Sequence, residues 1–77
     1  MKTIHSERYA FVVAELRKAR LEQKVTQSSL AELLRKPQSY VAKVELLERR
    51  LDVVEVVDWL HAIGLEPAAF FRRFEWW

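Results

Sequence analysis

Apolar residues recur every three or four positions along most of the chain, which is the spacing of one face of an α-helix. The first stripe predicts a helix over about residues 7–23, and Ser6 precedes it as a suitable N-cap. We interpret this helix as a scaffold for the rest of the domain. Its expected core-facing residues are Tyr9, Val12, Val13, Leu16 and Ala19.

Residues 26–45 read as two short helices joined by a tight turn. Thr26 can cap the first of them, because its side-chain oxygen can accept a hydrogen bond from a free backbone N–H. Pro37 suits the first turn of the second helix and biases Lys36 away from helical geometry, so the break is expected at about Arg35 and Lys36. Two crossed helices with so short a connection form a helix-turn-helix unit.

The remaining apolar pattern predicts two further helices. One runs over about residues 53–63 and is followed by Gly64, a good left-handed helix terminator. Pro67 then opens a last helix that reaches about Phe74. The expected fold is therefore an all-α, five-helix single domain over residues 1–77. The core-facing positions of the fourth helix are Val53, Val56, Val57, Leu60 and Ile63.

The segment 26–45 resembles the phage-repressor-like (XRE, or Cro/C1-type) helix-turn-helix family. With Leu16, Arg20 and residues 48–52, the resemblance covers roughly residues 8–70. It implies a transcriptional regulator of repressor type that binds double-stranded DNA in the cytoplasm, on the nucleoid when bound. It also implies a partly buried ion pair between Arg20 and Glu45. The matching positions in the helix-turn-helix core are Gln27, Leu30, Ala31, Ser39, Tyr40, Val41, Lys43, Val44 and Glu45.

The resemblance assigns DNA contacts to the start of the second helix of the pair and to nearby cations. Gln38 can pair with adenine through two hydrogen bonds, and Lys43 prefers the O6 and N7 atoms of guanine. Ser39 can contact a base or a phosphate, and Tyr40 a sugar or a thymine methyl group. Gln27 is expected to contact a phosphate and to steady Gln38. Phosphate contacts are also expected from Arg35, Lys36, Arg49 and Arg50.

The sequence departs from the family after Glu45, where Leu46 and Leu47 replace the usual small residue and glycine. Leucine favours a helix and resists the left-handed conformation that would end one. Helices three and four could therefore fuse into one long helix, which would exchange helices between two chains in a domain-swapped dimer. The opposing signal is a capping box formed by Asp52 and Glu55, which would start a separate helix. We favour the swapped or otherwise intimate homodimer.

The C-terminal aromatic residues add to this expectation. Two or three of them could complete the core, but their number favours an oligomer contact. An alternative to the regulator is then a dimerisation or self-assembly protein, natural or engineered, that keeps a repressor scaffold and binds little DNA. The predicted oligomer contacts are Leu46, Leu47, Phe70, Phe74, Trp76 and Trp77.

The charge of the chain is unevenly distributed. Residues 1–50 carry eleven basic and six acidic side chains, a net +5, whereas residues 51–77 carry two and five, a net −3. A basic front and an acidic back are typical of a protein that presents one side to phosphates, although small domains are often uneven. No apolar run approaches the length of a membrane span, and the first residues lack the apolar core of a signal peptide.

Catalytic and metal sites find little support. The chain has no cysteine, so disulfides and thiolate metal sites are excluded. His5 and His61 are far apart and follow no ligand spacing, and no glycine-rich phosphate loop or Ser/His/Asp set is present. We therefore expect no enzymatic activity, no metal, no cofactor and no small-molecule ligand.

Overall fold

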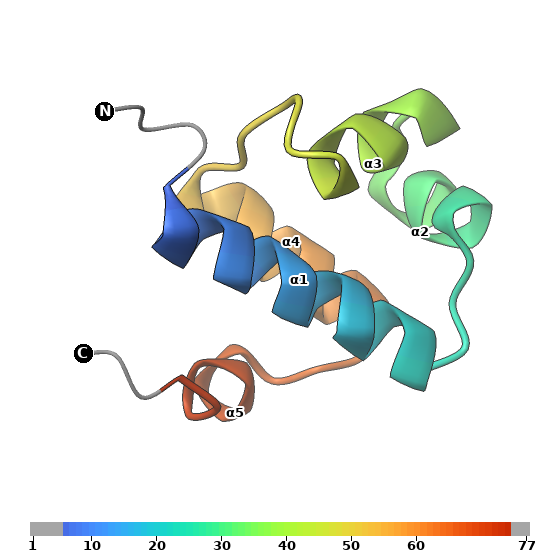
Figure 1. Ribbon diagram of the computed structural model, residues 1–77. Coiled ribbons are helices and arrows are strands. Elements are labelled where there is room, and N and C mark those ends of the chain that lie inside the picture. Colours follow the sequence, from blue (N-terminus) through green and yellow to red (C-terminus); the bar gives the residue numbers. More distant parts are fainter. Residues whose placement is uncertain (1–5, 75–77) are drawn as a thin grey trace.

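The computed structural model describes residues 6–74, which form five helices and contain no strand (Figure 1). The predicted all-α, five-helix fold is confirmed. α1 crosses the middle of the molecule with α4 behind it, and α3 and α5 lie on opposite sides of α1 (Figure 1). The helices are α1 (Glu7–Glu22), α2 (Gln27–Leu34), α3 (Gln38–Glu45), α4 (Val53–Ile63) and α5 (Pro67–Phe71).

Three helices begin at side-chain caps that the sequence predicts. The hydroxyl oxygens of Ser6 and Thr26 accept the third backbone N–H of α1 and α2, at 3.1 and 3.0 Å. At the start of α4, the carboxylate of Asp52 accepts from the N–H of Glu55, whose carboxylate accepts from the N–H of Asp52 in return. α3 lacks such a cap, because Pro37 occupies its N-cap position and not, as predicted, its first turn.

Within residues 6–74, four helices are followed by a residue in the left-handed conformation, and only the last of these residues is glycine. In each case the N–H groups of that residue and of the next one bond back to carbonyls of the final turn, which is the Schellman arrangement. Non-glycine residues adopt the left-handed conformation at a cost of roughly 1–2 kcal/mol each. The four residues are Lys24 (φ 59°), Arg35 (φ 59°), Leu47 (φ 65°) and Gly64 (φ 88°).

The prediction that helices three and four fuse is wrong. α3 ends at Glu45, and the N–H groups of Leu47 and Glu48 bond to carbonyls within α3 at 3.0 and 2.8 Å. The loop after α3 is fastened to α1, because the N–H of Leu51 donates to the hydroxyl of Tyr9 at 3.0 Å. The chain therefore folds back on its own first helix, and the long fused helix expected in a domain-swapped dimer does not form.

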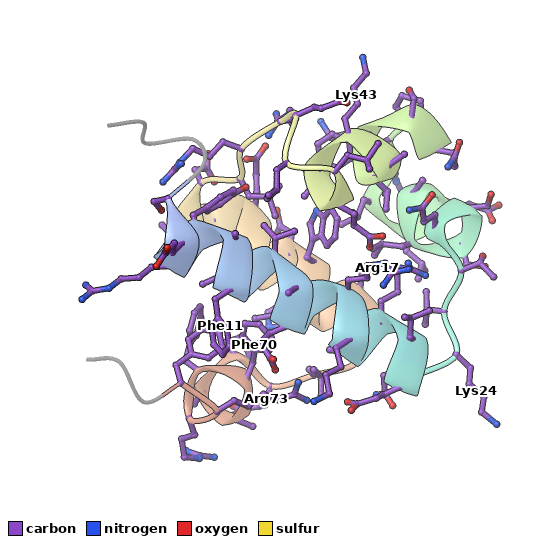
Figure 2. All side chains as sticks on the ribbon, in the orientation of Figure 1. Phe11, Arg17, Lys24, Lys43, Phe70 and Arg73 are labelled. Atoms are coloured by element: carbon purple, nitrogen blue, oxygen red, sulfur yellow. The ribbon has the colours of Figure 1, made fainter. Side chains whose placement is uncertain are left out.

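All five helices contribute to one core, in which Trp59 is the largest fully buried side chain. The C-terminal residues complete this core, because Phe70 and Phe74 are buried and the ring centroid of Phe74 lies 5.3 Å from that of Phe11, edge-on. Phe11 of α1 and Phe70 of α5 lie close together on this side of the molecule (Figure 2). The assignment of Phe70 and Phe74 to an oligomer contact is therefore wrong. Trp76 and Trp77 lie outside the described residues.

Three apolar residues at or near the ends of α3 and α4 are exposed or only partly buried. Val53 is 71% exposed, so its assignment to the core is wrong; the first turn of α4 projects beyond the packed interior. Leu46 is 67% exposed, and Leu47 is half-buried against α1. A role of these two leucines in oligomer contact stays a prediction.

Candidate nucleic-acid interface

The second helix of the pair, α3, has a buried apolar side and an exposed polar side. Val41 and Val44 are fully buried against α2 and the rest of the core. Gln38, Ser39 and Lys43 are exposed on the outside, and Lys43 points away from the body of the molecule (Figure 2). A helix held in this way can enter a groove without losing its own packing.

A buried ion pair fixes the C-terminal end of α3 to α1. The guanidinium of Arg20 donates from Nε and Nη2 to the two carboxylate oxygens of Glu45, at 2.7 and 2.9 Å. Its Nη1 atom donates to the carbonyl of Val25 at 2.8 Å, and both charged side chains are almost fully buried. The Nε atom of Arg17 lies 3.8 Å from Glu45 Oε1, and the Arg17 side chain is largely exposed. This neighbour was not predicted from the sequence.

Hydrogen bonds link this ion pair to the first residue of α3. Gln27 Nε2 donates to Glu45 Oε1 at 2.9 Å, and Gln38 Nε2 donates to Gln27 Oε1 at 2.7 Å. Gln27 therefore bridges a buried carboxylate and an exposed amide at the helix surface. This arrangement limits the rotamers of Gln38 and leaves its oxygen and one N–H available to a ligand.

Tyr40 connects α3 to α4. Its hydroxyl accepts from the indole Nε1 of Trp59 at 3.3 Å, and the two rings meet edge-on at 6.2 Å. Cations flank the exposed part of the ring: Lys36 Nζ lies 5.4 Å and the Arg49 guanidinium 4.9 Å from its centroid. Burial raises the pKa of the Tyr40 hydroxyl above its usual value of 10.0, so the phenol is neutral at physiological pH.

The two arginines of the α3–α4 loop have different surroundings. Arg49 donates to the carboxylate of Glu55 at 3.0 Å and to the carbonyl of Arg50 at 2.6 Å. The hydrogen bond from Arg49 lowers the pKa of Glu55 below its usual range. The guanidinium carbon of Arg50 instead lies 4.2 Å from the centroid of the Tyr9 ring, in a cation–π contact. Sequence reasoning missed Tyr9 and Glu55 as partners, since only the capping box marked Glu55.

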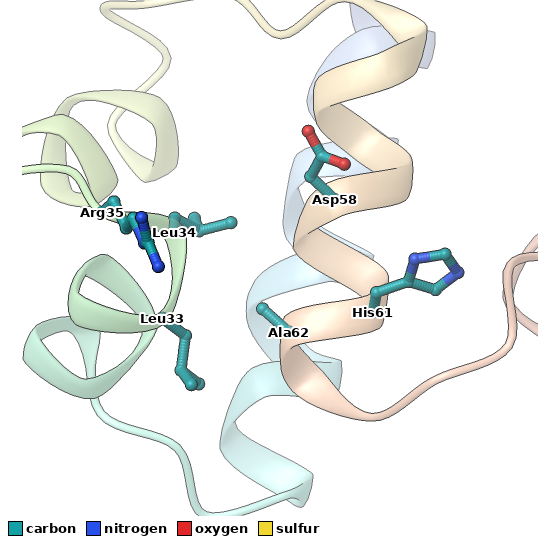
Figure 3. A pocket seen from close by; sticks show the side chains of 6 residues that line it. All are labelled: Leu33, Leu34, Arg35, Asp58, His61 and Ala62. Carbon is teal, nitrogen blue, oxygen red and sulfur yellow. The ribbon is translucent and has the colours of Figure 1, made fainter.

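Arg35 and Lys36 lie in the turn between α2 and α3, and both are exposed. Arg35 also borders an open pocket of about 400 Å³ between α2 and α4 (Figure 3). Asp58 faces this pocket from α4, whereas the ring of His61 points away from α2 (Figure 3). No group of three His, Cys, Asp or Glu side chains within residues 6–74 is arranged to hold a metal ion.

The comparisons with known proteins agree with this geometry. A helix-turn-helix family model matches residues 16–70, from the middle of α1 to α5. The solved structure of an XRE-family like protein from Pseudomonas syringae pv. tomato str. DC3000 is 44% identical, with a TM-score of 0.85. The match covers 92% of this chain and 87% of that chain. No curated protein sequence matches significantly. Among the described residues, no helix is both long and apolar enough to cross a membrane. The chain belongs to the XRE-type helix-turn-helix family of DNA-binding regulators.

Proposed function

We propose that this protein binds duplex DNA sequence-specifically, with α3 in the major groove, and acts as a repressor-like transcriptional regulator. The observation that carries the proposal is the division of α3 into two sides. Val41 and Val44 are sealed in the core, while the side chains of Gln38, Ser39 and Lys43 are exposed together.

Gln38 is the strongest candidate for base recognition. One N–H of its amide donates to Gln27. The second N–H can donate to N7 of adenine while the amide oxygen accepts from N6, so the two bonds to the base are compatible with the bond to Gln27. Lys43 lies more than a turn further along and can reach O6 and N7 of guanine. Ser39 and the exposed edge of Tyr40 supply shorter contacts.

Phosphate contacts would come from residues around the two ends of α3. Arg35 and Lys36 are exposed in the turn before it, and Gln27 lies beside Gln38 at the start of α2. Arg50 lies in the loop after it. These side chains supply affinity and salt dependence without reading sequence.

The regulator would act as a two-fold homodimer on a palindromic operator. Successive major grooves on one face of DNA are about 34 Å apart, which sets the separation of the two α3 helices. Exposed Leu46 at the end of α3 is a candidate contact between subunits. Repression would follow because the bound dimer excludes polymerase, and this role requires the protein to reside with the nucleoid in the cytoplasm.

Selection from a random duplex library tests this proposal and reports the half-site spacing. The selected duplex is then titrated with Gln38→Ala and Lys43→Gln, each of which should weaken binding by about 1–3 kcal/mol and relax preference at one base position. Arg72→Gln is a matched control, because α5 lies on the far side of α1 from α3 (Figure 1). Recovery of no preferred sequence, or wild-type affinity in both α3 variants, would refute the proposal.

A further inference from the structure

A cluster of side chains joins α3 to the start of α4, and we call it the Tyr40 clamp: Tyr40, Arg49, Glu55 and Trp59. The Arg49 guanidinium lies 4.9 Å from the centroid of the Tyr40 ring, within the range of a cation–π contact. The same guanidinium donates to Glu55 at 3.0 Å. Trp59 donates to the Tyr40 hydroxyl at 3.3 Å, so the tyrosine is held at its ring and at its tip.

The guanidinium of Arg49 is already engaged on several sides. Its Nη1 atom donates both to Glu55 and to the carbonyl of the next residue, Arg50. Glu55 is in turn fixed, because its carboxylate also accepts from the N–H of Asp52 in the capping box of α4. A phosphate would have to compete with this carboxylate for the same cation, and the carboxylate itself repels phosphate.

Contacts of its side chains with other helices help to fix the position of α3. No side chain caps its N-terminus, since Pro37 occupies that position. Its C-terminus closes through Leu47, which is in the left-handed conformation that leucine disfavours. Beyond its buried valines, α3 is fixed to α1 through Glu45 and to α4 through Tyr40.

We infer that Arg49 is a positioning residue, which fixes α3 against α4 by holding Tyr40, and not the phosphate ligand that its charge and place in the chain suggest. The inference rests on the proposed function for its effect on DNA affinity. A phosphate ligand contributes to the salt dependence of binding, whereas a positioning residue changes the affinity equally at every salt concentration.

Salt titrations of DNA binding separate the two roles. Loss of one phosphate contact lowers the slope of log K against log salt by about 0.9. We expect Arg49→Gln to weaken binding about five- to tenfold and to keep the wild-type slope, since it removes a cation–π contact and an ion pair. Arg35→Gln, at an exposed residue assigned to a phosphate contact, is the comparison variant that should lower the slope, and Arg72→Gln is the control that should change neither quantity.

Arg49→Lys provides a charge-preserving variant that should not impair folding. Lysine keeps the positive charge but lacks the planar guanidinium that stacks on Tyr40 while bonding to two oxygens. A positioning role therefore predicts that Arg49→Lys loses affinity almost as Arg49→Gln does. Retention of affinity by Arg49→Lys, together with a reduced slope for Arg49→Gln, would overturn the inference.

A measurement without DNA separates failure of this inference from failure of the proposed function. The indole N–H proton resonance of Trp59 reports its hydrogen bond to Tyr40 in the free protein. We expect both Arg49 variants to shift this resonance, and Arg72→Gln to leave it unchanged. An unmoved Trp59 resonance would refute the positioning role even if the protein binds DNA, and a shifted one would support it even if no operator is found.

Discussion

Replacing Glu45 with glutamine tests how strongly the buried ion pair holds α3 on α1. The carboxylate of Glu45 accepts two hydrogen bonds from Arg20 and one from Gln27, and its side chain is only 4% exposed. Glutamine has nearly the same shape but carries no charge, and its side-chain nitrogen is a donor. The variant therefore leaves the Arg20 cation buried without a counter-ion. It also places the amide NH2 of the new side chain against an N–H group of Arg20 or Gln27, where no hydrogen bond can form.

The expected cost follows from the burial of both partners. Removing one member of a buried ion pair typically destabilises a protein by about 3–5 kcal/mol, because the remaining charge is neither paired nor hydrated. A domain of this size is stabilised by only roughly 4–12 kcal/mol in total. The melting temperature should fall by more than about 12 °C, and the variant will be close to unfolding at 37 °C.

Urea denaturation measures this loss as a decrease in the midpoint with an unchanged m-value. The informative partner is the double variant Arg20→Met with Glu45→Leu, which removes both charges and keeps apolar volume. Replacement of a whole buried pair is often neutral or stabilising, by up to about 4 kcal/mol, so the double variant should be more stable than Glu45→Gln.

The reasoning fails if Glu45→Gln lies within about 1 kcal/mol of the wild type, which is the range of an exposed ion pair. It also fails if the double variant is less stable than the single one. In that case the attraction between the two charges would exceed the cost of removing them from water, and the pair would stabilise the fold.

Three further predictions concern the helix ends. Lys24→Gly should raise the free energy of unfolding by about 0.5–1 kcal/mol. The cost of the left-handed conformation is larger for lysine than the entropy that the more flexible glycine loses on folding. Leu47→Gly relieves the same strain but loses a half-buried side chain, so thermal melts should show a smaller gain than for Lys24→Gly. The capping box should give a specific acid sensitivity. Arg49 and the N–H of Asp52 lower the pKa of Glu55, so its stabilisation is complete above the ordinary carboxyl value of 4.5 and is lost as the pH falls through the lower folded value. Glu55→Gln can still form the capping bond but has no carboxylate to protonate. The free energy of unfolding of this variant, measured at neutral and at acidic pH, should therefore lack the decrease that protonation of Glu55 causes in the wild type.

The helix boundaries were largely predictable because they depend on local chemistry. Ser6, Thr26 and Asp52 cap helices through hydrogen bonds that span three residues, and such spacing is visible in a sequence. Gly64 likewise marks the end of α4 by its own conformational freedom. The pairing of Arg20 with Glu45 spans 25 residues, and only the family resemblance pointed to it.

The loop after α3 was mispredicted because tertiary contacts override helix propensity there. Two leucines favour continuation of the helix, and the left-handed Leu47 costs roughly 1–2 kcal/mol. The structure offsets this cost with the hydrogen bond from Leu51 to Tyr9, the capping box of α4 and the partial burial of Leu47 beside α1. Two of these three contacts join distant parts of the chain, so only the capping box is visible in the sequence, and alone it does not outweigh two strong helix formers.

The C-terminal aromatics were misjudged for a related reason. Counting aromatic residues in one short segment does not reveal how much space the other helices leave open. Phe11 of α1 packs against Phe74, and α5 lies against α4, so that Phe70 and Phe74 are both buried. Trp59 was missed as a core residue because the valines around it gave an equally good helical stripe.

The two attachments of α3 separate affinity from sequence choice. Glu45 connects one end of the helix to α1, and Tyr40 connects its side to α4, while neither Arg20 nor Trp59 is exposed. A substitution in either attachment lowers the fraction of molecules in which α3 has the binding orientation. It should therefore weaken binding to every duplex by the same factor. A substitution at Gln38, Ser39 or Lys43 leaves that orientation intact and should change the order of preferred duplexes. Gln27 bonds to both Glu45 and Gln38, so its substitution should combine the two effects.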